Sequence, residues 1–138
     1  MEHSAQFDLG VVQRIEAEAL GVPGQRTFRI LLQGGSVTAC LWLEKEQLQA
    51  LALGIEQVLL QLPKARRGEP ADDQPAEGSW PSSHDIEFKI GQLALGYDES
   101  CDLIVLLVHE LEADPEGPAT LHLKATRDLM ERFSHQAQ

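Results

Sequence analysis

Residues 27–62 decide the fold, and they read TFRILLQGGSVTACLWLEKEQLQALALGIEQVLLQL. Apolar and polar residues alternate with a period of two over 27–33 and again over 37–43, which predicts two strands. The Gly34-Gly35 pair between them predicts a hairpin turn, because glycine adopts the positive φ of such turns without steric cost.

The period changes after the second of these strands. From Glu44 onward, apolar residues recur at the spacing of one helix face, which predicts a helix that ends at Leu62, before Pro63. A strand is also expected before the hairpin, over 12–20. The first half of the chain is therefore predicted to be strand, strand, strand, helix.

The second half follows the same order. Strands are predicted over 88–97, 102–112 and 119–125, and a helix over 126–133. Letters recur as well, since Ala19-Leu20-Gly21 matches Ala94-Leu95-Gly96 and Ile30-Leu31-Leu32 matches Val105-Leu106-Leu107. We expect one α+β domain over 1–138, made of two βββα repeats that form a mainly antiparallel, barrel-like sheet with two helices.

Residues 63–86 lie between the two repeats and hold four of the seven prolines. Their composition cannot bury enough apolar surface to offset the entropy of ordering, so it predicts a disordered internal loop. Trp80 in this loop either docks a partner or folds back onto the domain.

Charge and hydropathy narrow the function classes. The 138 residues carry 11 Lys plus Arg against 22 Asp plus Glu, a formal net charge of -11 that makes nucleic acid an unlikely partner. No apolar run approaches the roughly 18 residues that a transmembrane helix needs, and the N-terminus does not resemble a secretory signal. We expect a cytoplasmic protein without membrane insertion.

The segments Leu20-Gly-Val-Pro-Gly-Gln-Arg-Thr-Phe28 and Leu43-Glu-Lys-Glu-Gln-Leu48 resemble the opening of a bacterial repeat-protein family of uncharacterised function. The resemblance extends over most of the chain and implies no established activity. Members of that family are often encoded beside a histidine-phosphatase-like and a lipid-kinase-like protein. They usually carry a cysteine-bearing tail like a small zinc ribbon, and the given sequence has none, so no metal role is transferred.

Two features are candidates for binding. The turn that includes Gly24, Gln25 and Arg26 could hold a phosphate or carboxylate, although it opens no helix, and a structural turn with Arg26 paired to a carboxylate is the better expectation. Cys40 and Cys101 lack the spacing of a zinc site and are expected to be reduced thiols. We identify no catalytic residue, metal site or cofactor.

The second candidate is an apolar sheet face. Alternation assigns to the face away from the helices a set of residues that is too apolar to remain in water: Leu31, Cys40, Trp42, Leu93, Leu95, Tyr97, Ile104, Leu106 and Val108. Either the sheet curls and buries this face, or another protein or a second copy covers it.

The functional expectation is a non-enzymatic protein-interaction module that binds a protein partner or forms a homo-oligomer. The alternative is a small-molecule or anion-binding protein, or an enzyme subunit, that uses the Gly21–Arg26 turn.

Overall fold

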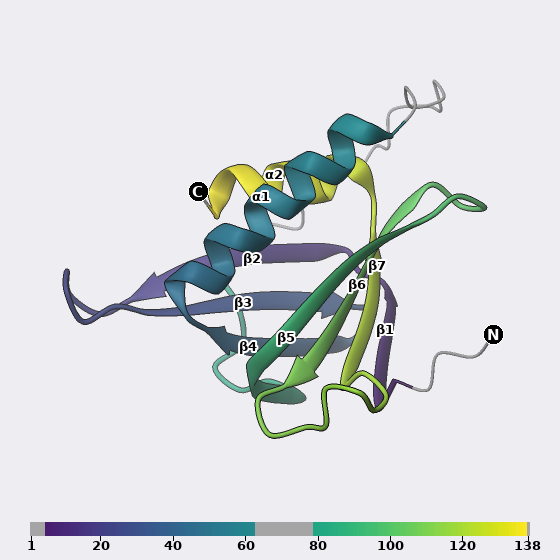
Figure 1. Cartoon of the computed structure of the whole chain (residues 1–138). Coiled ribbons are helices and arrows are strands. Elements are labelled where there is room, and N and C mark those ends of the chain that lie inside the picture. The colour runs from purple at the N-terminus through teal and green to yellow at the C-terminus, as the bar shows by residue number, and fades with distance from the viewer. Residues whose placement is uncertain (1–4, 63–78, 138) are drawn as a thin grey trace.

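The computed structural model describes residues 5–62 and 79–137, and within them the chain folds into a seven-stranded sheet with two helices on one side (Figure 1). The first half contains β1 (Phe7–Val11), β2 (Arg14–Leu20), β3 (Thr27–Gly34), β4 (Val37–Leu43) and α1 (Lys45–Gln61). The second half contains β5 (Ile86–Asp98), β6 (Leu103–Glu110), β7 (Leu121–Ala125) and α2 (Arg127–Gln136).

The strands lie in the order β1-β7-β6-β5-β4-β3-β2, and most neighbours are antiparallel. The exceptions are β1 beside β7 and β5 beside β4, which pair in parallel. The α+β class and the mainly antiparallel sheet predicted from the sequence are therefore confirmed. No helix in the described part of the chain is long and apolar enough to cross a bilayer.

The sheet curls strongly but is not closed into a barrel, so of the alternatives that the sequence left open, full closure does not occur. Its two edge strands, β1 and β2, do not pair with each other; they are successive parts of one extended segment. Where they join, Val12 N–H donates to Lys124 O and Gln13 N–H to Gln33 O, both at 2.8 Å. Gly34 permits this curl, because a Cβ on it would lie 2.6 Å from Leu9 O.

The helices cover the concave inner face of the sheet, and the core lies between them. The most deeply buried side chains include Ile30, Leu41, Ile55, Leu123 and Phe133. Glu44 and Thr126, at which the sequence predicted the two helices to begin, are their N-caps.

When the two helix N-caps are aligned, the register of the strands before them differs by one residue from the match of letters. Leu43 and Ala125 each precede a helix N-cap, and they lie opposite Phe28 and Ile104. Phe28 therefore corresponds to Ile104, and two residues further on Ile30 corresponds to Leu106. The letters matched Leu31 to Leu106 instead, and such a slip turns every side chain to the opposite face.

The predicted apolar face away from the helices is wrong for most of its members. Six of its members belong to the inner face, because β5 and β6 place them directly opposite one another: Leu93, Leu95, Tyr97, Ile104, Leu106 and Val108. Ile104, Leu106 and Val108 are fully buried by the chain itself, and the other three pack against the core.

The remaining members lie on the outer face, which carries polar residues on β2 and β3 and the half-buried Val105 and Leu107 on β6. Leu31 and Cys40 are buried, and the Trp42 indole N–H donates to Glu87 Oε2 at 2.8 Å. Trp80 folds back onto the same face, where its Nε1 donates to Glu16 Oε1 at 3.0 Å and Arg14 stacks 4.1 Å from its ring centroid. The predicted loop over 63–86 falls mostly outside the described residues, which resume at Ser79.

Candidate functional site

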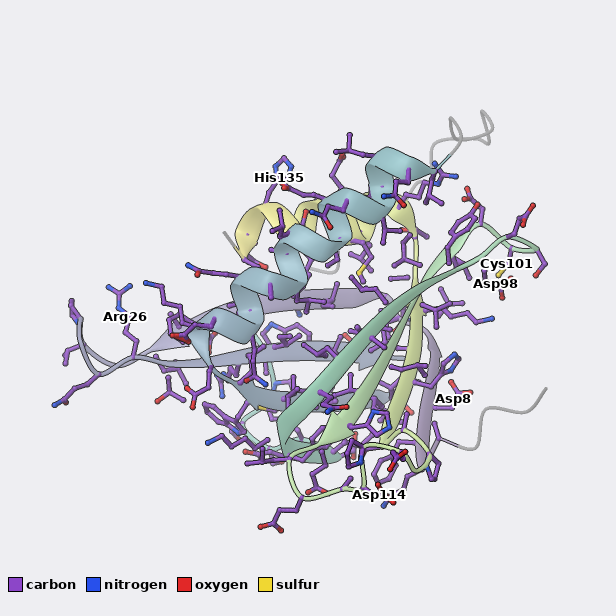
Figure 2. All side chains as sticks on the ribbon, in the orientation of Figure 1. Asp8, Arg26, Asp98, Cys101, Asp114 and His135 are labelled. Carbon is purple, nitrogen blue, oxygen red and sulfur yellow. The ribbon has the colours of Figure 1, made fainter. Side chains whose placement is uncertain are left out.

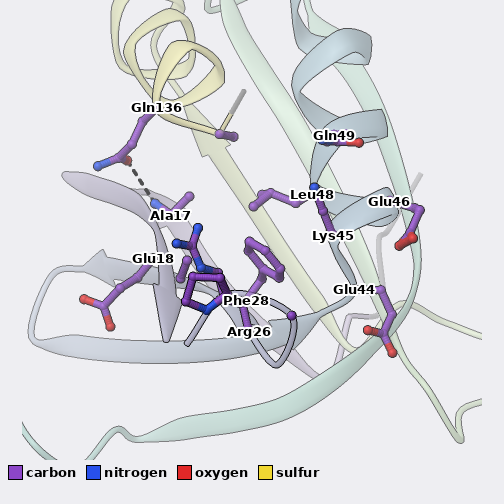
Figure 3. A pocket seen from close by; sticks show the side chains of 14 residues that line it. Ala17, Glu18, Arg26, Phe28, Glu44, Lys45, Glu46, Leu48, Gln49 and Gln136 are labelled. Atoms are coloured by element: carbon purple, nitrogen blue, oxygen red, sulfur yellow. Dashed lines mark hydrogen bonds between the residues drawn. The ribbon is translucent and has the colours of Figure 1, made fainter. Parts of the chain in front are cut away.

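A groove of about 710 Å³ opens where the end of β2, the first turns of α1 and the end of α2 meet (Figure 3). We call it the β2 groove. Its lining residues are Ala17, Glu18, Ala19, Pro23, Gly24, Arg26, Phe28, Glu44, Lys45, Glu46, Leu48, Gln49, Gln136 and Ala137.

The floor of the β2 groove is apolar. Ala19 lies opposite Phe28 across the β2–β3 ladder, so both side chains face the helices, and Ala17 lies on the same face two residues earlier. Leu48 from α1 and Ala137 after α2 complete the apolar lining. The small alanine side chains leave the hollow that larger residues would fill.

The free edge of β2 forms one wall of the groove. Ala17 N–H donates to Gln136 Oε1 at 2.9 Å, so this N–H group points away from β3 (Figure 3). Because the backbone groups of alternate residues point the same way, those of Ala19 also point away from β3. Among the described residues none pairs with the Ala19 backbone on that side. An unpaired strand edge is a natural place for another chain to bind.

The charged rim carries both signs. Arg26 and Lys45 form no ion pair with a described residue, and neither does Glu46. Arg29 Nε donates a hydrogen bond to Glu18 Oε1 at 2.7 Å, and Glu44 Oε1 lies 3.9 Å from Lys89 Nζ. A rim of mixed charge does not select anions by long-range attraction, particularly on a chain with a net charge of -11.

The N-terminus of α1 stands at the groove but its backbone groups are partly used. The Gln47 side chain accepts a hydrogen bond from Glu44 N–H at 2.8 Å and donates to the carbonyls of Ile90 and Gly91, each at 3.3 Å. This bridge fixes the start of α1 against β5. It therefore holds the Lys45 and Gln49 side of the groove in place.

The turn predicted as an anion site reaches the groove only in part. Gly24 and Arg26 line it, and Arg26 points toward the helix side of the sheet (Figures 2 and 3). Gln25 does not line the groove; its N–H donates to Val22 O at 2.9 Å and closes the turn. Among the described residues, Arg26 forms no ion pair with a carboxylate.

A second polar cluster surrounds the turn between β5 and β6, where Asp98 and Cys101 are labelled in Figure 2. Lys124 Nζ lies 2.7 Å from Asp98 Oδ2, and Arg127 Nε donates to Asp102 Oδ1 at 2.8 Å. The hydrogen bond from Lys124, helped by those from Ser100 and Cys101, holds the pKa of Asp98 well below its usual range.

The same network includes Tyr97, whose hydroxyl donates to Asp102 Oδ1 at 2.6 Å, and this bond raises the pKa of Tyr97. Its charged members are paired with one another, so the network ties the β5–β6 turn to β7 and α2. We therefore assign it a structural role. Within the described residues, no group of three or more His, Cys, Asp or Glu side chains could hold a metal ion.

The sequence missed most of the β2 groove. It identified Gly24 and Arg26, but gave no signal for Ala17, Ala19 or Gln136, whose proximity depends on where α2 ends against β2. Alternation places Ala17 and Ala19 on the same face as Ile15, but it does not show that Gln136 lies beside them.

Comparison with known proteins gives a family but no activity. No curated protein and no solved structure matches the chain significantly. Residues 7–138 match the family described as "Protein of unknown function (DUF3090)". Because this match covers nearly the whole chain, the protein belongs to the DUF3090 family.

Proposed function

We propose that the protein is a non-enzymatic protein-interaction module and that the β2 groove receives a segment of its partner. The observation that carries this proposal is an apolar floor beside an unpaired strand edge, at Ala19 and Phe28. Apolar hollows with a few polar groups around them are the usual places where ligands and peptides bind.

The groove replaces the apolar sheet face as the interaction surface. Ile104, Leu106 and Val108 on β6 are covered by the chain itself, so a partner could reach them only if the core opened. The β2 groove needs no such opening.

The proposal places the chain in the cytoplasm. Cys40 and Cys101 are free thiols, and free thiols are typical of a reducing compartment.

One observation favours a second candidate, an anion or small-molecule site. Arg26 lines the groove without an ion-pair partner among the described residues, and a guanidinium can bind a phosphate or carboxylate in a bidentate manner. Glu18, Glu44 and Glu46 line the same groove and oppose an anion, which is why this candidate ranks second.

Affinity capture from the native cell tests the first candidate when groove variants are compared. Ala19→Tyr fills the floor of the groove, whereas Val22→Tyr adds the same side chain at an exposed turn position that does not line it. We expect a partner that is captured by the wild type and by Val22→Tyr but lost with Ala19→Tyr. Equal capture by all three proteins would show that the groove is not the binding site.

A thermal-shift screen tests the second candidate. Inorganic phosphate, nucleotides and phosphorylated metabolites should each leave the melting temperature unchanged if the module binds protein alone. A stabilisation of several degrees that disappears in Arg26→Ala would reverse the ranking.

A further inference from the structure

Strand β5 is longer than the strands beside it, and part of one of its edges has no neighbour. β4 pairs with β5 only from Ile86 to Lys89. At the bulge between Ile90 and Gln92, β5 turns away from β4, and its second half pairs with β6 alone (Figure 1). The side of residues 91–97 that faces away from β6 therefore has no described strand next to it. We call this side the β5 edge.

The register fixes which backbone groups lie on the β5 edge. Lys124 O accepts a hydrogen bond from Val12 N–H, so the backbone of Lys124 faces β1 and that of Leu123 faces β6. Leu106 exchanges hydrogen bonds with Leu123 and therefore points its backbone groups away from β5. Leu95 lies opposite Leu106, so its own N–H and C=O point away from β6, toward the β5 edge.

Leu93 and Leu95 together leave a row of unpaired backbone groups. The same alternation that places the backbone groups of Leu95 on the β5 edge places those of Leu93 there. Among the described residues, none bonds to the backbone of either residue on that side. Each of the two offers one N–H and one C=O, and such a row is a template for another strand.

An apolar groove of about 260 Å³ lies between α1 and the β5 edge. We call it the β5 groove, and its lining residues are Gln47, Ala50, Leu51, Gly91, Leu93 and Leu95. Leu93 and Leu95 are half-buried and pack against the core, so the groove brings the apolar interior to the surface. Pockets for drug-sized molecules are larger, about 300–1,000 Å³, so the β5 groove suits the side chains of a peptide.

A side-chain amide already occupies the start of the β5 edge. Gln47 Nε2 donates to the carbonyl oxygens of Ile90 and Gly91, each at 3.3 Å. An amide N–H thus lies where the N–H of an added strand would lie. The pairing that Gln47 begins stops before Leu93.

Strand β2 shows how an amide completes such an edge. Ala17 N–H donates to the side-chain carbonyl of Gln136 at 2.9 Å. With the helix N-caps aligned, Ala17 corresponds to Leu95, and Gln136 corresponds to Gly54 of α1. Gly54 has no side chain, so α1 offers the Leu95 N–H no such acceptor. An amide from outside the domain can take this place.

We propose that the β5 edge binds an extended segment of a partner protein, which adds to β5 as a strand and places an apolar side chain in the β5 groove. This site is separate from the β2 groove and gives the module a second binding surface. Every second side chain of the segment points toward the helices and is apolar, and the alternate side chains face water. Because the chain carries a net charge of -11, basic residues at these alternate positions favour its approach.

A single extended segment fits this edge better than the edge strand of a second folded copy. β4 and the start of α1 occupy the same side of β5 next to the open part, at Lys89 and Gly91. A strand that belongs to another sheet would bring its own neighbours against these elements. A free segment has no such neighbours.

The probe is a seven-residue peptide of alternating lysine and valine, titrated into the intact protein and followed by amide chemical shifts and hydrogen exchange. We expect amide exchange at Leu93 and Leu95 to slow by about tenfold or more at saturation, with no change at Ala19. Ala50→Tyr fills the β5 groove and should raise the dissociation constant by about tenfold or more. Leu60→Tyr, at an exposed position of α1 outside the groove, should leave it within about twofold. Chemical shifts centred on Ala19, or equal affinities of the two variants, would overturn the site.

Two methylated peptides separate strand addition from binding through side chains alone. One carries backbone N-methyl groups on its valines and the other on its lysines, and both keep every side chain and charge. An antiparallel added strand bonds to β5 through the valine N–H groups, and a parallel one through the lysine N–H groups. We therefore expect one methylated peptide to lose binding and the other to keep it. Equal affinities of the two would overturn strand addition. A dimer of the protein without peptide, detected by light scattering and with Leu93 and Leu95 already protected, would replace the partner segment by a second copy and overturn the proposal.

Discussion

Truncation of Leu106 tests whether the register of β6 in this fold is right. Leu106 lies on the inner face opposite Leu95 and Leu123 and is fully buried, although alternation assigned it to the face away from the helices. Leu106→Ala removes three carbon atoms, worth about 2 kcal/mol in transfer free energy at about 0.8 kcal/mol per methylene. The cavity that remains raises the expected loss of unfolding free energy to about 3–4 kcal/mol, inside the range of about 2–5 kcal/mol for buried leucines.

The assay is equilibrium unfolding in urea, with Leu60→Ala as the matched control. Leu60 is 85% exposed on α1, so its truncation should change the unfolding free energy by less than about 0.5 kcal/mol. With a slope of about 2 kcal/mol per molar urea, Leu106→Ala should lower the midpoint by roughly 1.5–2 M. A loss below about 1 kcal/mol for Leu106→Ala, or a change in solution mass without a change in stability, would refute the register described here.

Three further predictions concern the curl of the sheet, the charged network and a helix end. Gly34→Ala should lower the free energy of unfolding by more than about 1 kcal/mol, because the added Cβ would lie 2.6 Å from Leu9 O. Chemical denaturation measures this loss, and an unchanged free energy of unfolding would mean that β1 does not approach β3 this closely. Asp98→Asn should lower stability most above about pH 4, because the pKa of Asp98 is depressed in the folded state. The stabilisation by this carboxylate is lost as the pH falls through that depressed pKa, so a difference from wild type that stays constant from pH 5 to pH 2.5 would contradict the role of Lys124. Thr126→Ala should lower the free energy of unfolding by about 1 kcal/mol, because the Thr126 hydroxyl accepts a hydrogen bond from Leu129 N–H at 3.2 Å. Thr126→Ser keeps the hydroxyl and should therefore lose little stability in the same thermal or urea unfolding experiment.

The sequence was sufficient for the elements whose periodicity is strong. The helix from Lys45 to Gln61 begins and ends within one residue of the predicted limits, because an apolar stripe, acidic residues in the first turn and Pro63 all mark it. Strand β1 was missed. It is a short edge strand, largely exposed and interrupted at Gly10, so it carries no alternation that separates it from a loop.

The side of the sheet on which each residue lies was harder to predict. Alternation showed which residues of a strand share a face, but it did not show which face of β5 and β6 lies toward the helices, and the match of Leu31 with Leu106 by letters is one residue away from the register of the ladders. The β2 groove could not be predicted at all, because it depends on the position at which α2 ends against β2 in space. Arg26 was singled out for its glycine-rich turn, and it reaches the groove through the curl of the β2–β3 hairpin.

Photo-cross-linking in the native cell tests the β2 groove most directly. Benzoylphenylalanine at position 49, on the groove wall, should form an adduct with one partner protein, and mass spectrometry should identify the linked segment of that partner. The same group at position 57, on the exposed side of α1 outside the groove, should not form that adduct, and Ala19→Tyr should abolish the adduct from position 49. Equal adducts from positions 49 and 57, or an adduct from position 49 that persists in Ala19→Tyr, would contradict the assignment of the β2 groove as the interaction site.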